Sequence, residues 1–207
     1  MTQVILVRHG ETEWNRVERF RGRADIPLNE TGLQQAEATG RRVAAMCQPV
    51  AIYSSPLSRA VKTAEAIAKH FDLEVKVHLG LVDIDYGAWE GLSPGEVRKH
   101  WSYTLDGWYS APHLVRIPGG ETLDDVGKRG LETVSNLASQ HGTETIVLVG
   151  HTVINRLILL SMLGLENESF WHIKQNTCAI NVFEVDQDET RVVSLNDTSH
   201  LNPIPEG

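Results

Sequence analysis

Short runs of apolar residues alternate along this chain with longer segments in which apolar and polar positions repeat at helical spacing. The short runs are rich in β-branched residues and end near turn-forming residues, which predicts a buried strand at about 3–7 and further strands at about 50–53, 73–77 and 145–149. The longer segments predict helices at about 29–47, 57–71, 122–140 and 152–163. Two later apolar runs, 179–185 and 191–195, flank the polar turn 186–189 and predict a strand pair.

This alternation of strands and helices favours one class of fold. It predicts an α/β protein, a three-layer α/β/α sandwich with a mostly parallel central sheet. We expect a single domain over residues 1–207, because no linker, repeat or low-complexity tract interrupts the pattern. Residues 92–118 lie in a glycine- and tryptophan-rich stretch without clear periodicity, which we interpret as a short insertion at the rim. The serines of Ser54-Ser55-Pro56 are expected to cap the helix that follows.

Two histidines, His9 and His151, directly follow predicted strands, in the triplets RHG and GHT. Ligands of parallel α/β sheets bind beyond the carboxyl ends of the strands. A single histidine at such a place is more typical of a buried structural residue. Two of them, each beside a glycine and each after an apolar strand, indicate that the rings of His9 and His151 meet at a common site.

The distribution of charge points to an anion site. The chain has 19 Lys and Arg against 27 Asp and Glu, a net charge of −8, which argues against nucleic acid as a partner. Residues 1–70 nevertheless hold ten basic and seven acidic side chains. An acidic protein that concentrates arginine in one segment is suited to bind an anion there.

The sequence also argues against a membrane or secreted protein. No basic leader followed by an apolar stretch begins the chain, and no apolar run approaches the roughly 20 residues of a membrane span. The two cysteines, Cys47 and Cys178, lie far apart and in no metal or redox spacing. We therefore expect a soluble cytoplasmic protein without a membrane partner.

Several blocks of the sequence resemble the motifs of the histidine phosphatase superfamily, also called the phosphoglycerate-mutase-like family. Residues 6–15, LVRHGETEWN, resemble the family signature around its first histidine. Further blocks follow in the family's order and extend the resemblance over nearly the whole chain, at 22–28, 54–60, 83–91, 119–121 and 149–151. The resemblance implies a phosphoglycerate-mutase-like fold and an enzyme of phosphate transfer.

The resemblance also implies roles for individual residues. His9 would be the nucleophile and become a phosphohistidine, while His151 would donate to a phosphate oxygen as an imidazolium. Arg8 and Arg59 match the family's two arginines. Because a phosphate ester carries up to about two negative charges near neutral pH, two guanidinium forks suit its oxygens. With this positive charge no metal ion and no cofactor are expected, and Asn15 would donate one more hydrogen bond to the phosphate.

The leaving group needs a proton, and one carboxyl group can supply it and later activate water. The family usually places a glutamate four residues before a glycine, where this chain has Asp83 before Gly87. The shorter side chain is a departure from the family pattern. We assign Asp83 as the acid, with Asp85 and Glu90 as its rivals, and expect burial to raise its pKa.

Fewer signals identify the residues that meet the rest of the substrate. Arg21 stands where many relatives have glutamine, and it is either a solvated rim charge or a contact to a substrate carboxylate or second phosphate. Gly22, Tyr86 and Thr152 are also expected to border the substrate. His200, near the end of the chain, either reaches the site or is an exposed tail residue.

The sequence therefore favours a metal-independent phosphatase that acts on a small phosphorylated acid such as phosphoserine. Sugar phosphates and α-ribazole phosphate stay open as substrates. A phosphoglycerate mutase with the same chemistry is the alternative, although 92–118 is short for its insertion. A non-catalytic phospho-ligand module would be expected to lack His9, an arginine or His151, and all are present. A homodimer is possible if 179–185 forms an edge strand.

Overall fold

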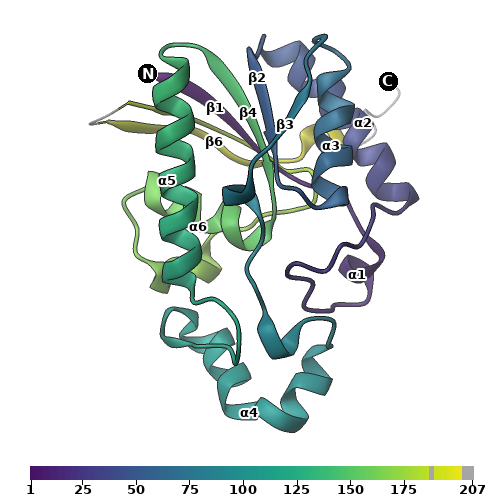
Figure 1. Cartoon of the computed structure of the whole chain (residues 1–207), viewed down its shortest axis with the longest axis vertical. Coiled ribbons are helices and arrows are strands. Elements are labelled where there is room, and N and C mark those ends of the chain that lie inside the picture. Colours follow the sequence, from purple (N-terminus) through teal and green to yellow (C-terminus); the bar gives the residue numbers. More distant parts are fainter. Residues whose placement is uncertain (187–188, 202–207) are drawn as a thin grey trace.

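A six-stranded sheet forms the centre of the computed structural model, which describes residues 1–186 and 189–201 (Figure 1). The strand order is β3-β2-β4-β1-β5-β6. The strands are β1 (Thr2–Arg8), β2 (Ala51–Ser54), β3 (Val75–Val77), β4 (Thr145–Gly150), β5 (Ile180–Val185) and β6 (Thr190–Asp197). The first four run parallel to one another, and β5 and β6 add an antiparallel pair at one side, so the sheet is mostly parallel as predicted.

Helices cover both faces of this sheet and complete the three layers (Figure 1). The four helices are α2 (Glu30–Met46) and α3 (Ser58–Ala68) on one face and α5 (Leu123–His141) and α6 (Thr152–Met162) on the other. The side chains of β1 alternate between the two layers. Val4 and Leu6 pack in the cluster that holds α5 and α6, whereas Ile5 and Val7 pack in the cluster that holds α2 and α3. Burial on both faces explains the almost continuous apolar run of β1.

Shorter elements connect these layers. Helix α1 (Glu13–Arg16) follows β1, and α4 (Pro94–Ser110) forms a cap beyond the carboxyl edge of the sheet (Figure 1). The 3-10 helices are η1 (Leu79–Leu81), η2 (Gly87–Trp89), η3 (Pro112–Leu114), η4 (Asn167–His172) and η5 (Ser199–Leu201). None of the helices within the described ranges is long and apolar enough to cross a membrane.

Helix α4 corrects the expectation that 92–118 has no regular element. The helix begins at a capping box in which the Ser93 hydroxyl accepts from the Glu96 N–H and the Glu96 carboxylate accepts from the Ser93 N–H. It is interrupted at Trp101, whose φ of −138° is not helical. Because the two halves point in different directions, no single apolar stripe runs through the segment, and its periodicity is lost in the sequence. Its place at the rim agrees with the interpretation as an insertion.

The strand at 179–185 is not an edge strand, so the expectation that it pairs across a dimer is wrong, while a homodimer formed in another way stays a prediction. Strand β5 pairs with β1 on one side and with β6 on the other, and its backbone groups are therefore engaged on both sides. Within the part of the chain that the structure describes, the outer strands of the sheet are β3 and β6. The predicted turn 186–189 lies partly outside the described residues.

Helices α2 and α3 both contact the loop that follows His9. From α3, the Thr63 hydroxyl accepts a hydrogen bond from the backbone N–H of Gly10 at 3.1 Å. Gly32, in the first turn of α2, lies so near the backbone of Glu11 that a Cβ at position 32 would overlap the Glu11 carbonyl oxygen. A glycine at this position therefore lets the helix support the loop directly.

Replacing Gly32 by alanine should destabilise the protein, because either the helix or the loop must move to make room for the new methyl group. We expect Gly32→Ala to lower the free energy of unfolding by about 1–3 kcal/mol in urea titrations. Gly95→Ala is the matched control, since a Cβ at that helical position meets no atom within 4 Å. Equal stability of the two variants would contradict the close approach.

Candidate active site

Five residues that the sequence assigns to phosphate chemistry meet at the carboxyl edge of the sheet. Arg8 ends β1, His9 follows it, and His151 follows the neighbouring strand β4 as the N-cap of α6. Arg59 lies in the first turn of α3, after β2, and Asp83 lies between η1 and η2. These side chains are buried, with residue exposures between 0% and 7%. The structure therefore brings together all five residues proposed for catalysis.

The backbone holds His9 in one tautomer. Its Nδ1 lies 2.6 Å from the carbonyl oxygen of Gly10, so Nδ1 carries the proton and donates it. The lone pair of Nε2 is then free for nucleophilic attack. Burial first, and then the charges of Arg59 and His151, hold the pKa of His9 well below its usual range. The ring is therefore neutral near pH 7, which is the state that attack on phosphorus requires.

His151 lies beside His9, with the two ring centroids 5.0 Å apart. Its Nδ1 accepts a hydrogen bond from Arg59 Nε at 3.3 Å, and its Nε2 lies 2.7 Å from Ser55 Oγ. Because Nδ1 accepts, the neutral ring carries its proton on Nε2 and donates to Ser55. Burial first, and then Arg59, lower the pKa of His151 well below its usual range. The ring is thus neutral in this structure, and the imidazolium that the resemblance implies beside a bound phosphate stays a prediction.

Ser55 has a role that the sequence pattern did not reveal. The N-cap of α3 is Leu57, which has no side-chain cap, so the expected capping of this helix by Ser54 and Ser55 is wrong. The Ser55 hydroxyl is fully buried and faces the ring of His151 instead. Its place in the same sequence block as Arg59 was the only signal for this contact.

Backbone carbonyls orient the two arginines. Arg8 Nη1 donates to the Gln175 carbonyl at 2.6 Å, while its buried Nε has no hydrogen-bond partner among the described residues. Arg59 donates to the carbonyls of Gly22 and Ala24 at 2.9 and 2.7 Å. Burial lowers the pKa of Arg8 to about 9 and that of Arg59 to about 10, so both remain cations near pH 7. Gly22, which was expected to border the substrate, does not line the cavity and acts through its carbonyl.

Asp83 places a carboxyl group at the first turn of α6. Its Oδ1 accepts from the backbone N–H of Val153 at 3.3 Å. Burial raises the pKa of Asp83, and this effect outweighs the opposing charges of Arg59 and Arg21. A carboxyl group with a raised pKa can give a proton to a leaving group near neutral pH and later accept one from water.

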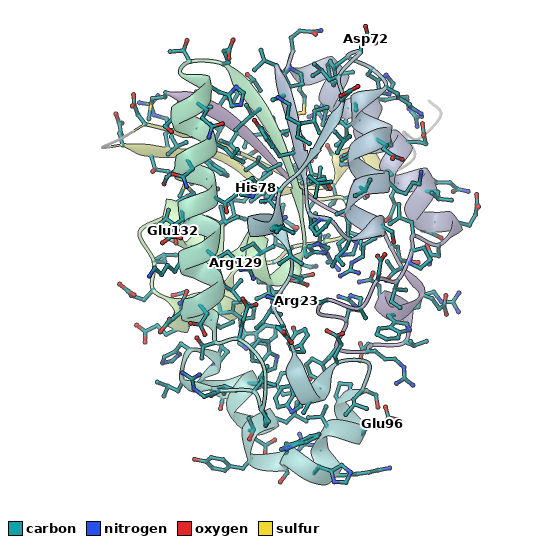
Figure 2. All side chains as sticks on the ribbon, in the orientation of Figure 1. Arg23, Asp72, His78, Glu96, Arg129 and Glu132 are labelled. Carbon is teal, nitrogen blue, oxygen red and sulfur yellow. The ribbon has the colours of Figure 1, made fainter. Side chains whose placement is uncertain are left out.

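Two arginines outside the cavity hold the segment that carries Asp83. Arg129 of α5 donates to backbone carbonyls of this segment at 2.7 and 3.1 Å and pairs with Glu121. Arg23, from the loop after α1, pairs with Asp85 at 3.3 Å and with Glu121 at 3.1 Å. Both arginines are labelled in Figure 2, where they approach the segment from different elements. These contacts fix the backbone from which the Asp83 side chain extends.

The rival carboxylates are engaged outside the cavity. Asp85 accepts from the backbone N–H of Gly87 at 2.8 Å, and Glu90 accepts from the backbone N–H of Arg23 at 2.8 Å. Neither side chain lines the cavity. The geometry therefore favours Asp83 as the acid. In the described parts of the chain, no group of three or more His, Cys, Asp or Glu side chains is placed to hold a metal ion.

A cavity of about 450 Å³ opens beside Arg8 and Asp83. Four residues predicted to contact the substrate line it, namely Asn15, Arg21, Tyr86 and Thr152. The side-chain oxygen of Asn15 accepts from the backbone and hydroxyl of Thr12, which leaves its amide nitrogen to donate. The Thr152 hydroxyl is buried and has no partner among the described residues. Both groups are thus available to a bound molecule.

The cavity also has walls that the sequence did not reveal. Besides the predicted Tyr86, five further aromatic side chains line it, and they are Phe20, Trp108, Tyr109, Phe170 and Trp171. Arg156 of α6 also lines it, one helical turn after Thr152, and this spacing on the helix after the second histidine was the available signal. His200 does not line the cavity, and its Nε2 lies 3.0 Å from the Thr39 hydroxyl of α2.

Comparison with known proteins agrees with this geometry. A sequence profile of the histidine phosphatase superfamily (branch 1) matches residues 4–198. Phosphoserine phosphatase 1 of Hydrogenobacter thermophilus is 34% identical over 201 residues, which cover 97% of this chain and 95% of that protein. The solved structure of Bacillus stearothermophilus YhfR has a TM-score of 0.93 at 32% identity, covering 98% of this chain and 100% of that one.

A second solved structure includes a bound molecule. A phosphoserine phosphatase mutant from Entamoeba histolytica, in complex with phosphoserine, has a TM-score of 0.85 at 31% identity and covers 98% of this chain and 100% of that one. The chain thus belongs to the histidine phosphatase superfamily. It is a phosphatase with the phosphoglycerate-mutase-like fold.

The lowered pKa of His9 has a consequence for stability. Below about pH 6.5 the unfolded chain takes up a proton at this histidine that the folded chain does not, so stability falls as the pH falls. His9→Asn removes that difference. Between pH 6.5 and 5, its unfolding free energy should fall less steeply than that of the wild type, by up to about 1.4 kcal/mol per pH unit.

Urea titrations at several pH values measure this slope. His172→Asn, on the surface helix η4, controls for the loss of an imidazole outside the site. Parallel slopes for His9→Asn and the wild type would show that the folded protein binds a proton at His9 as readily as the unfolded chain.

Proposed function

We propose that this protein hydrolyses a small phosphorylated acid, with phosphoserine as the first candidate, through a phosphohistidine on His9. The observation that carries the proposal is the hydrogen bond from His9 Nδ1 to the Gly10 carbonyl, which leaves Nε2 unprotonated. Arg8 and Arg59, both buried, and the Asp83 carboxyl group with its raised pKa lie at the same edge of the sheet as His9. A nucleophile, a positive cradle for phosphate and a proton donor are the parts that phosphoryl transfer requires.

In the first step, His9 Nε2 attacks phosphorus and the bond from phosphorus to the ester oxygen breaks. The carboxyl group of Asp83 gives its proton to that oxygen, so the leaving group departs as an alcohol. Arg8 and Arg59 neutralise charge on the phosphoryl oxygens. The histidine ring is cationic while it is bonded to phosphorus, and the Gly10 carbonyl stabilises its Nδ1–H.

His151 changes its protonation as the phosphate binds. A phosphate dianion beside the ring favours the imidazolium and so raises the pKa of His151. The Ser55 hydroxyl rotates and can accept from or donate to Nε2, so it accommodates either state of the ring. Protonation at Nδ1 breaks the hydrogen bond from Arg59 Nε, and the new Nδ1–H donates to a phosphoryl oxygen instead.

In the second step, water attacks phosphorus and the nitrogen–phosphorus bond breaks. The Asp83 carboxylate accepts a proton from the water, and the electron pair returns to His9 Nε2. Phosphate then leaves, and the starting state is restored. The positive charge comes from side chains of the chain itself, so no step requires a metal ion.

The choice of a phosphorylated acid rests on the relatives and on charge. The proteins from H. thermophilus and E. histolytica bear the name phosphoserine phosphatase, and the latter was solved with phosphoserine bound. Arg21 and Arg156 line the cavity in addition to Arg8. This positive charge exceeds what a phosphate alone requires and favours a substrate with a second anionic group. A cytoplasmic location stays a prediction.

A phosphorus NMR time course in excess EDTA tests the proposal. Wild-type protein should release inorganic phosphate from phosphoserine, and His9→Ala should lose nearly all turnover because no covalent intermediate can form. Conversion of 3-phosphoglycerate to 2-phosphoglycerate without release of phosphate would instead establish the mutase. Substantial hydrolysis by His9→Ala would remove His9 as the nucleophile.

Asp83→Asn should lower kcat by about 10²- to 10⁴-fold, because the leaving oxygen loses its proton donor. Phosphate affinity should change much less, since the site keeps both arginines. Asp85→Asn is the matched comparison on the neighbouring carboxylate, and it should lower kcat much less than Asp83→Asn because Asp85 only supports the segment. The reverse order of the two variants in steady-state assays would transfer the role of the acid to Asp85.

A further inference from the structure

Arg156 is mostly buried, yet none of the described residues forms a hydrogen bond with it. It lies on α6, and its guanidinium carbon is 4.9 Å from the ring centroids of both Phe170 and Trp171. Its Nε is buried without a partner among the described residues, and burial lowers its pKa. Two aromatic contacts stabilise the cation but satisfy none of its N–H groups.

The other arginines on the cavity wall differ from Arg156 in this respect. Arg8 donates to the Gln175 carbonyl, Arg21 to the Trp14 carbonyl, and Arg19 to Glu96 and a backbone carbonyl. Within the described part of the chain, Arg156 is thus the cavity arginine whose N–H groups are all unengaged. Burying a cation without hydrogen bonds costs free energy. A bound anion that accepts from its N–H groups would offset that cost.

Its position relates Arg156 to the leaving group. Arg156 lines the same cavity as Asp83, whereas His9, Arg59 and His151 lie outside the lining of that cavity. Since Asp83 protonates the ester oxygen, a cation near Asp83 adjoins the leaving group more than the phosphoryl group. Thr152, with its own unpartnered hydroxyl, lies one turn away on the same helix face.

We propose that Arg156 binds a carboxylate on the leaving group of the substrate, with the Thr152 hydroxyl as a second donor. Contact with Phe170 and Trp171 orients the planar guanidinium, whose N–H edge matches the two oxygens of a carboxylate. The inference rests on the proposed function and adds the residue that distinguishes a phosphorylated acid from other phosphate esters. Arg156 is then a specificity determinant, and the two aromatic residues position it.

Binding to a variant without turnover tests this assignment. Phosphoserine and phosphoethanolamine differ by one carboxylate, so the ratio of their dissociation constants reports on recognition of that group alone. In the His9→Ala background, calorimetry in EDTA should show phosphoserine binding about 10- to 100-fold more tightly. Adding Arg156→Gln should bring the ratio close to one and leave the affinity for phosphoethanolamine nearly unchanged.

Two further variants complete the design. Arg98→Gln removes an exposed arginine of α4 that pairs with Asp106, and it should keep the ratio of the His9→Ala protein. Arg21→Gln tests the other arginine considered for this contact. The assignment is overturned if Arg156→Gln keeps the ratio, if it weakens both ligands equally, or if only Arg21→Gln abolishes the ratio.

Misfolding of a variant and absence of turnover by the wild type are distinguished from a loss of carboxylate recognition. If Arg156→Gln does not fold, Arg156→Lys is measured instead; it should lower the ratio because an ammonium lacks the planar fork, and an unchanged ratio overturns the proposal. Turnover by the wild type is a separate measurement. A protein that shows the carboxylate preference in binding but releases no phosphate would refute the proposed function and leave the binding site in place.

Discussion

Buried positive charge around His9 is the constraint on which the rest of the site depends. Arg59 and Arg8 are the proposed ligands of a phosphate dianion, and burial together with their charges keeps both histidine rings neutral. For His9 this is the reactive state, and the Gly10 carbonyl selects the nitrogen that reacts. Asp83 is affected in the opposite direction by the same surroundings. Burial raises the pKa of its carboxyl group, although the charges of Arg59 and Arg21 lower it.

Much of the fold could be predicted because its signals are local. The parallel strands are short and apolar, and the turns after two of them carry glycine beside His9 and His151, so the sequence predicts both the layers and the common edge. The helix α4 was missed because its break at Trp101 disrupts the helical period, although the capping box at Ser93 marks its start. The position of β5 inside the sheet depends on pairing with β1 and β6, which is not a local property.

The catalytic residues could be proposed from motifs, but their partners could not. Ser55 contacts a histidine almost a hundred positions later, and the carbonyl that holds Arg8 belongs to Gln175. Such contacts arise only when distant segments fold together. The protonation state of His151 could not be predicted from the sequence either, because it depends on burial and on a hydrogen bond from Arg59 Nε. Arg156 lay within a recognisable helix, yet its unpartnered state is visible only in three dimensions.

The hydrogen bond from the Val153 N–H to Asp83 ties the proposed acid to helix α6, which also carries other residues of the site. Helix α6 holds the acid by a backbone N–H, has His151 as its N-cap, and carries Thr152 and Arg156 on its first turns. A shift of this helix would displace all of them together. Side chains of η4 and α4 complete the cavity, and Phe170 and Trp171 of η4 pack on Arg156 of α6. A substitution that moves α6 would therefore change the reaction and the choice of substrate together.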